Sequence, residues 1–200
     1  MKKTIILAAL LAAAFLPGSL QAGQVWAVSI DTQSIAPSDL VLLLQFNGLG
    51  SPDPATATVD LFSGAASFTE DPLTSGATAQ GSGWVLDTTV LNALYLDVHT
   101  VGPRLSFSVT FAGAALDAPN PSADLSLFGV DLLDPTATST LDGFPFPGLA
   151  LEVGNGAVVR SPDFDLNNTL INAAPVPEPG TLGLLALGGA LGFVFRRRAA

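Results

Sequence analysis

Residues 104–111 (Arg-Leu-Ser-Phe-Ser-Val-Thr-Phe) alternate polar and apolar side chains without interruption. Successive side chains of an extended strand point to opposite faces, so one face of a sheet is predicted to carry Leu105, Phe107, Val109 and Phe111. Gly102-Pro103 and Gly113 are the predicted boundaries of this strand. Residues 39–46 are instead almost continuously apolar, which predicts a central strand covered on both faces. The chain is therefore constrained first of all to form sheets.

Other short segments repeat the strand pattern between turns rich in Gly, Pro, Asn and Asp. The further predicted strands are residues 26–31, 56–62, 84–86, 94–98, 125–132, 149–153, 157–160 and 169–172. Within residues 125–132 the apolar side chains change from odd-numbered to even-numbered positions, and this shift predicts a bulge near Phe128-Gly129. Gly154-Asn155-Gly156 predicts a hairpin. Because no sustained helical period occurs between residues 23 and 172, we predict an all-β domain there, an antiparallel β-sandwich of jelly-roll type.

The N-terminus has the layout of a secretory signal peptide. Lys2 and Lys3 precede twelve apolar residues, and Pro17-Gly18 then leads to a small residue at Ala22. This layout predicts a signal helix over residues 1–22, with cleavage between Ala22 and Gly23. Retention as a membrane anchor is the alternative, but the apolar stretch is too short to span comfortably.

The C-terminus combines a proline-rich segment, an apolar run and a basic end. Residues 173–180 are too rich in proline for regular secondary structure and form a predicted extended linker that contains Val176-Pro177-Glu178-Pro179. Residues 181–195 form a predicted transmembrane helix, which at about 1.5 Å per residue extends only about 22 Å and is a poor permanent anchor. The tail, residues 196–200, carries Arg196, Arg197 and Arg198, which the positive-inside rule keeps in the cytoplasm. Residues 23 to about 176 are thereby predicted to lie outside the inner membrane.

This C-terminal order resembles the PEP-CTERM sorting signal of Gram-negative bacteria. The resemblance implies recognition by a membrane-embedded exosortase that cuts near Pro177-Glu178-Pro179 and releases or transfers the protein. Three strand-like segments also resemble an uncharacterised strand-rich group of PEP-CTERM proteins, namely residues 44–47, 57–59 and 105–110. That group implies no activity.

Charge and composition exclude several functions for the exported part. Two arginines against sixteen acidic residues give residues 23–175 a formal charge of −14. Two cations among so many acidic groups cannot displace the counterions of phosphate, so nucleic acid is excluded as a partner. The chain has no cysteine and the exported part has no lysine. Thiolate and Schiff-base chemistry are therefore excluded as well.

The candidate catalytic and metal-binding residues are few. His99, the one histidine, lies two residues from Asp97 on a predicted strand, but no nucleophile motif accompanies it. Most aspartates lie in turns, where local hydrogen bonding explains them. Asp163, Asp165 and Asn167 match the first three ligand positions of a calcium loop, although a turn before the last strand explains them equally well. We predict no catalytic residues.

These observations predict a non-enzymatic exported protein with a structural or adhesive role. The PEP-CTERM resemblance implies a link to exopolysaccharide, biofilm or floc formation. A carbohydrate-binding or carbohydrate-processing module is the first alternative. It requires a cleft with exposed aromatic side chains and converging carboxylates, whereas buried Trp26 and Trp84 would favour the structural role. A retained single-span membrane protein is the second alternative, and it depends only on whether the C-terminal segment is cut.

Overall fold

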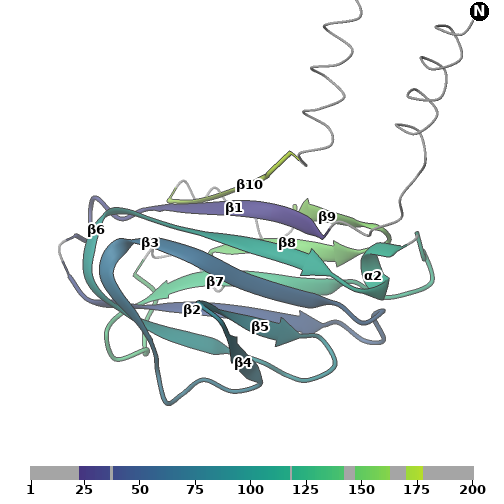
Figure 1. Ribbon diagram of the computed structural model, residues 1–200, viewed down its shortest axis with the longest axis horizontal. Helices are drawn as coiled ribbons and strands as arrows, with labels where there is room; N and C mark the ends of the chain where they lie inside the picture. The colour runs from purple at the N-terminus through teal and green to yellow at the C-terminus, as the bar shows by residue number, and fades with distance from the viewer. Residues whose placement is uncertain (1–22, 37, 118, 142–146, 163–169, 178–200) are drawn as a thin grey trace, which may run out of the picture.

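The computed structural model describes residues 23–36, 38–117, 119–141, 147–162 and 170–177. These residues form an all-β protein with a single four-residue helix, α2 (Ala114–Asp117). The strands, labelled in Figure 1, are β1 (Gln24–Asp31), β2 (Leu40–Gly48), β3 (Thr56–Glu70), β4 (Ala77–Gln80), β5 (Gly83–Asp87), β6 (Leu94–Ala112), β7 (Ser126–Leu133), β8 (Leu149–Gly154), β9 (Ala157–Arg160) and β10 (Ile171–Pro175). Every pairing between these strands is antiparallel. Among the described residues no helix is long and apolar enough to span a membrane.

Strand β6 organises the sheet because its two halves have different neighbours. Its first half pairs with β2, from Leu94 to Val98, and its second half pairs with β1, from Arg104 to Phe111. Strand β3 runs along the other side of both halves. The strand order is therefore β4-β5-β3-β6-β2-β7-β8-β9, with β1 and β10 attached beside the second half of β6.

The predicted boundary at Gly102-Pro103 is wrong, because β6 runs through it. Proline lacks an N–H, but β6 changes partners here, and Pro103 instead uses its carbonyl, which accepts the N–H of Thr32 at 3.1 Å. The pairing of β3 with β6 also shifts register between Asp60 and Ala65. Gly64 lies at this irregularity with φ +96°, and a Cβ there would stand 1.9 Å from the carbonyl oxygen of Arg104. Only glycine fits this close approach of the two strands.

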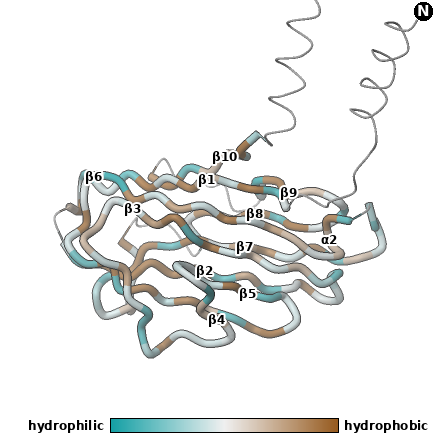
Figure 2. Tube along the Cα trace, in the orientation of Figure 1, coloured by the Kyte–Doolittle hydropathy of each residue, from teal (hydrophilic) through white to brown (hydrophobic). Residues whose placement is uncertain are grey.

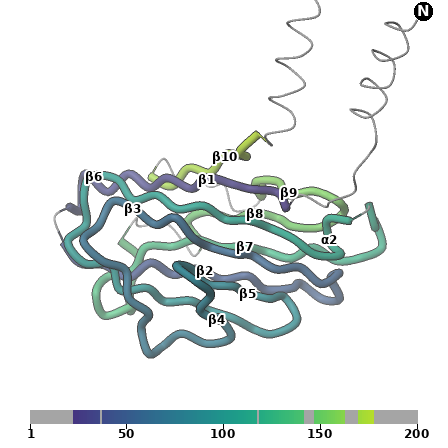
Figure 3. Tube along the Cα trace, viewed as in Figure 1, coloured from purple at the N-terminus to yellow at the C-terminus, as the bar shows by residue number. Residues whose placement is uncertain are grey.

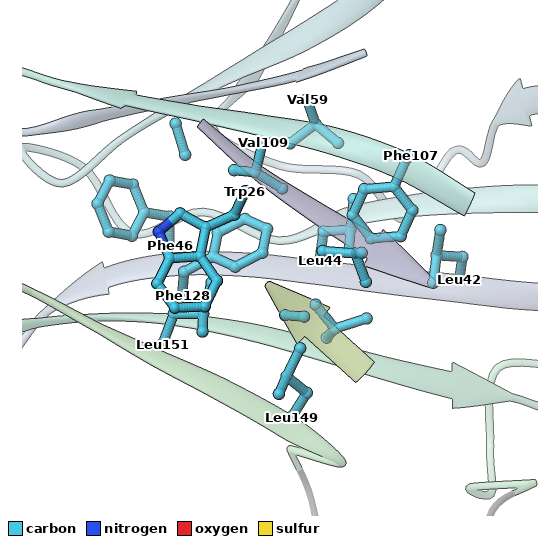
Figure 4. Packing of buried hydrophobic residues seen from close by; sticks show 14 of the residues in the cluster. Trp26, Leu42, Leu44, Phe46, Val59, Phe107, Val109, Phe128, Leu149 and Leu151 are labelled. Atoms are coloured by element: carbon cyan, nitrogen blue, oxygen red, sulfur yellow. The ribbon is translucent and has the colours of Figure 1, made fainter. Parts of the chain in front are cut away.

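One continuous core fills the space inside the bent sheet. Figure 2 shows hydrophobic stretches along the strands. In Figure 4, Trp26 and Val59 approach the core from β1 and β3, and Phe46 and Phe128 approach it from β2 and β7. The rings of Phe46, Phe111 and Phe128 meet edge to face, with centroids 5.4–6.1 Å apart. All three side chains are fully buried, so this trio lies at the centre of the core.

The strand predictions are largely confirmed, with three further differences. The prediction of a bulge near Phe128-Gly129 is wrong, because β7 pairs in unbroken register with β2 and β8. Both faces of β7 are buried, so apolar side chains at odd-numbered and at even-numbered positions both fit one regular strand. Strand β3 continues eight residues beyond the predicted end at Phe62, and β4 and α2 were not predicted. The hairpin is confirmed, because Asn155 (φ 52°) and Gly156 (φ 78°) connect β8 to β9 with the positive φ values of a type I′ turn.

The side chain of Asn92 extends the ladder between β2 and β6. The paired residues run from Leu40 opposite Val98 to Leu44 opposite Leu94, so Phe46 would come opposite Asn92. There the amide of Asn92 replaces a strand backbone: its oxygen accepts the N–H of Phe46 at 2.8 Å, and its nitrogen donates to the carbonyl of Phe46 at 2.5 Å. Asn92 is only 1% exposed. One buried side chain thus satisfies two buried backbone groups of β2.

Candidate functional site

Strands β1 and β10 bring the two ends of the exported part together. They pair over five residues, from Ile30 opposite Ile171 to Trp26 opposite Pro175. Figure 3 shows these strands, purple and yellow, side by side although they lie at opposite ends of the described chain. The N–H of Val176 then donates to the carbonyl of Val25 at 2.8 Å. The sheet therefore holds the beginning of the predicted sorting motif beside the residues that follow the predicted signal cleavage.

The hydrogen-bond register explains why a proline is tolerated in β10. Besides the bond from Val176 to Val25, the N–H of Asp31 donates to the carbonyl of Leu170 at 2.7 Å. Hydrogen-bonded pairs alternate with non-hydrogen-bonded pairs in an antiparallel ladder, so Pro175 opposite Trp26 needs no donor. Residues 173–175 are consequently strand and not the predicted irregular linker. Proline fits because, within the described part of the chain, β10 is an edge strand that pairs with β1 alone.

Side chains hold β10 and the start of β1 in place. Ile171 and Ala173 are buried, together with Val28 and Ile30 of β1. The side chain of Gln24 reaches the β8–β9 hairpin, where it accepts the N–H of Val158 at 3.0 Å. A Cβ on Gly23 would lie 2.7 Å from the carbonyl of Phe111. The chain is therefore packed against the sheet from the first residue after the predicted cleavage site.

Most other predicted site residues lie outside the described part of the chain. This holds for Ala22, Glu178, Pro179, Arg196, Arg197 and Arg198, and also for the calcium candidates Asp163, Asp165 and Asn167. Gly23, Val176 and Pro177 are described. Within the described ranges no cluster of three or more histidine or acidic side chains is arranged to hold a metal ion.

His99 has a different acidic neighbour from the one its sequence position suggests. Its Nδ1 lies 3.2 Å from a carboxylate oxygen of Asp39, whose other oxygen accepts the N–H of Thr100 at 2.8 Å. The Thr100 N–H, and secondarily His99, lower the pKa of Asp39 below its ordinary value. Both side chains of the pair are about half exposed. Asp97 instead lies opposite Val41 and Thr69 in the sheet. We interpret the His99–Asp39 contact as a surface interaction that joins the residue before β2 to β6.

An aromatic hollow lies at the irregularity of β3. It has a volume of about 380 Å³ and is lined by Leu61, Phe62, Phe68, Ser82 and Trp84. Phe62 stacks on Phe107 of the core and meets Trp84 edge to face, with centroids 5.3 and 5.6 Å apart. The indole N–H of Trp84 donates to Glu70 at 2.8 Å. Leu61 is 73% exposed and has φ 54°, a conformation that is uncommon for leucine.

The two tryptophans therefore differ in environment. Trp26 is 7% exposed and belongs to the core, whereas Trp84 is partly exposed at the hollow. Burial of both would favour a structural role, and only Trp26 meets that criterion. The aromatic chemistry required by the carbohydrate alternative is present at one place in the fold.

Comparison with protein-family models matches residues 175–198 to the PEP-CTERM protein-sorting motif. The match begins at Pro175, the last residue of β10, so the motif starts where the sheet ends. The motif supports export and membrane-associated sorting, with processing by an exosortase. Comparisons with curated proteins and with solved structures give no match.

Proposed function

We propose that this exported, exosortase-sorted protein has a non-enzymatic structural or adhesive role at the cell surface or in the extracellular matrix, in association with exopolysaccharide or biofilm. The observation that carries the proposal is the junction between β10 and the PEP-CTERM motif. A folded domain that ends where the motif begins is suited to release from the membrane as one intact unit. The formal charge of −14 on residues 23–175 favours solubility after release.

The paired termini fit attachment of the unprocessed chain to one membrane at both ends. Gly23 directly follows the predicted signal helix, and Thr181, where the predicted transmembrane segment begins, follows Val176 by five residues. Five extended residues reach roughly 17 Å. With Val25 and Val176 hydrogen-bonded to each other, both predicted membrane segments leave the sheet at the same place. Termini at opposite ends of the domain would not permit this arrangement.

We also propose that the bent sheet is a β-sandwich of jelly-roll type. Support comes from the core, to which β1, β3 and the second half of β6 contribute from one side and β2, β7 and β8 from the other. Such a rigid scaffold, built without cysteine, suits a structural role in the matrix.

Intact mass spectrometry of the protein from the native host tests the proposal. We expect a species in the culture supernatant that begins at Gly23 and ends near Pro177-Glu178-Pro179, because both membrane segments are removed. A chain that ends at Ala200 and occurs only in membranes would contradict exosortase processing.

The second candidate function is carbohydrate binding, and the aromatic hollow favours it. Ligand sites are typically concave and apolar with a few polar groups, and here Glu70 is fixed beside Trp84. The strongly acidic surface favours a neutral polysaccharide over an anionic one. Carbohydrate processing is less well supported. Glycoside hydrolysis requires a pair of carboxyl groups, and Glu70 is the carboxylate that hydrogen-bonds to the described lining of the hollow.

Replacement of Trp84 by alanine tests this candidate. If a neutral glucan binds in the hollow, we expect Trp84→Ala to weaken binding about fivefold or more, since an aromatic contact contributes about 1 kcal/mol or more. Affinity electrophoresis in gels that contain dextran or alginate measures the retardation. Val159→Ala, which shortens an apolar side chain exposed to 48% elsewhere, is the control. Equal retardation of all three proteins would remove the hollow from consideration.

A further inference from the structure

We propose that β10 determines where the chain is cut: the exosortase breaks a peptide bond on the C-terminal side of Val176, and the released protein keeps β10 paired with β1. This inference rests on the exosortase processing proposed above. The step is a hydrolysis in which one amide C–N bond breaks. Water supplies the hydroxyl to the acyl carbon and a proton to the departing amine. The motif match identifies the region of processing, and the sheet sets its N-terminal limit.

The backbone before Pro177 is occupied by the sheet. Residues 170–176 face β1 in continuous register, with hydrogen bonds at both ends of the ladder, from Asp31 to Leu170 and from Val176 to Val25. A protease must reach both sides of the bond that it cuts. To reach a bond before Val176 the enzyme would first have to separate β10 from β1 and expose Ile171 and Ala173, which are buried.

Within the described residues, the last hydrogen bond that joins this segment to β1 is the one from Val176, and the chain becomes accessible there. The next residue, Pro177, has no N–H to donate and lies beyond the end of β10. Pro175, Val176 and Pro177 all have exposed side chains. The change from paired to unpaired backbone therefore falls within the matched motif, between Val176 and Pro177.

The position of the cut also matters for the released protein. A cut after Val176 removes no residue of the core and no partner of β1. A cut before Ile171 would remove β10 and leave the outer edge of β1 unpaired. An unpaired edge strand invites pairing with other chains, and the five-residue β10, which ends in a proline, is a poorer template for such pairing than the eight-residue β1.

A matched pair of substitutions at Ala174 tests the inference. Ala174 is exposed and lies opposite Ala27, at a position where the alternation of the ladder places a hydrogen bond. Ala174→Pro removes that donor, whereas Ala174→Val retains it and has the higher strand propensity. Loss of one bond of this kind is expected to open β10 about tenfold more often.

The full-length variants are expressed in the native host, and the C-terminus of each released protein is determined by mass spectrometry. We expect the wild type and Ala174→Val to end at or beyond Val176. Ala174→Pro should add products that end earlier. Hydrogen exchange on the released wild-type protein is a second readout that does not depend on the proline variant folding, and the amides of Ala174 and Val176 should be protected.

Three results would contradict the inference. A wild-type product that ends before Val176, or rapid exchange at Ala174 and Val176, would overturn the role of β10 while leaving exosortase processing intact. Recovery of only the unprocessed chain ending at Ala200 would overturn the proposed processing, and the cut position with it.

Discussion

Replacement of Asn92 by alanine is expected to destabilise the exported domain by about 3 kcal/mol, within a range of about 2–5 kcal/mol. The amide of Asn92 provides both hydrogen-bond partners for the buried N–H and carbonyl of Phe46. It also donates to the carbonyl of Asp87 at 3.0 Å. Alanine would leave these groups without a partner in a site that excludes water, and each unsatisfied group costs about 1–3 kcal/mol.

Urea denaturation of the exported domain, followed by tryptophan fluorescence, measures this effect. Asn172→Ala is the matched control, because Asn172 has an exposed side chain on β10. Its expected effect lies within about 0.5 kcal/mol of the wild type. If Asn92→Ala and Asn172→Ala lowered the unfolding free energy equally, the bonds to Phe46 would contribute little to stability.

The parts of the fold that were predicted correctly depend on local patterns. Both the strict alternation of residues 104–111 and the apolar run of residues 39–46 correspond to strands. Each pattern follows from the geometry of one pleated strand and can be recognised without knowing its partners. Gly154-Asn155-Gly156 likewise encodes its own turn through the φ values that it permits.

The features that were missed depend on partners far away in the sequence. Asn92 resembles an ordinary loop residue until Phe46, 46 positions earlier, lies beside it. Gly102-Pro103 looks like a strand boundary, but β6 can continue there because it exchanges β2 for β1 as its neighbour. His99 pairs with Asp39 and not with the nearby Asp97 for the same reason. Strand partners are set by the whole sheet, and sequence proximity does not reveal them.

The candidate site also has one part that the sequence predicts and one part that depends on the fold. The order of proline motif, apolar run and arginines is a linear pattern, and the family-model match at residues 175–198 agrees with its prediction from sequence. The pairing of Val176 with Val25 joins residues from the two ends of the exported part. Residues 173–175 were predicted as irregular because of their alanine and proline content. A short edge strand tolerates that composition where a central strand would not.

Replacement of Glu178 by glutamine is expected to reduce exosortase processing by roughly 10- to 100-fold, because a hydrogen bond to a charged group contributes about 1.5–3 kcal/mol. Glu178 is the only acidic residue after Asp165, and prolines flank it on both sides. A proline favours an extended conformation in the residue before it and offers no N–H of its own. Apart from Arg196, Arg197 and Arg198 at its far end, the matched motif has this carboxylate as its one charged group, three residues after the last residue of β10.

Pulse-chase labelling in the native host, with separation of the membrane-bound and released forms, measures the processing rate. Glu70→Gln makes the same chemical change at an exposed glutamate on β3 and should leave processing unchanged. Equal rates for wild type and Glu178→Gln would mean that the enzyme does not recognise the charge of the motif. Recognition would then depend on the conformational restriction that the two prolines impose, and the charge of Glu178 would have no part in sorting.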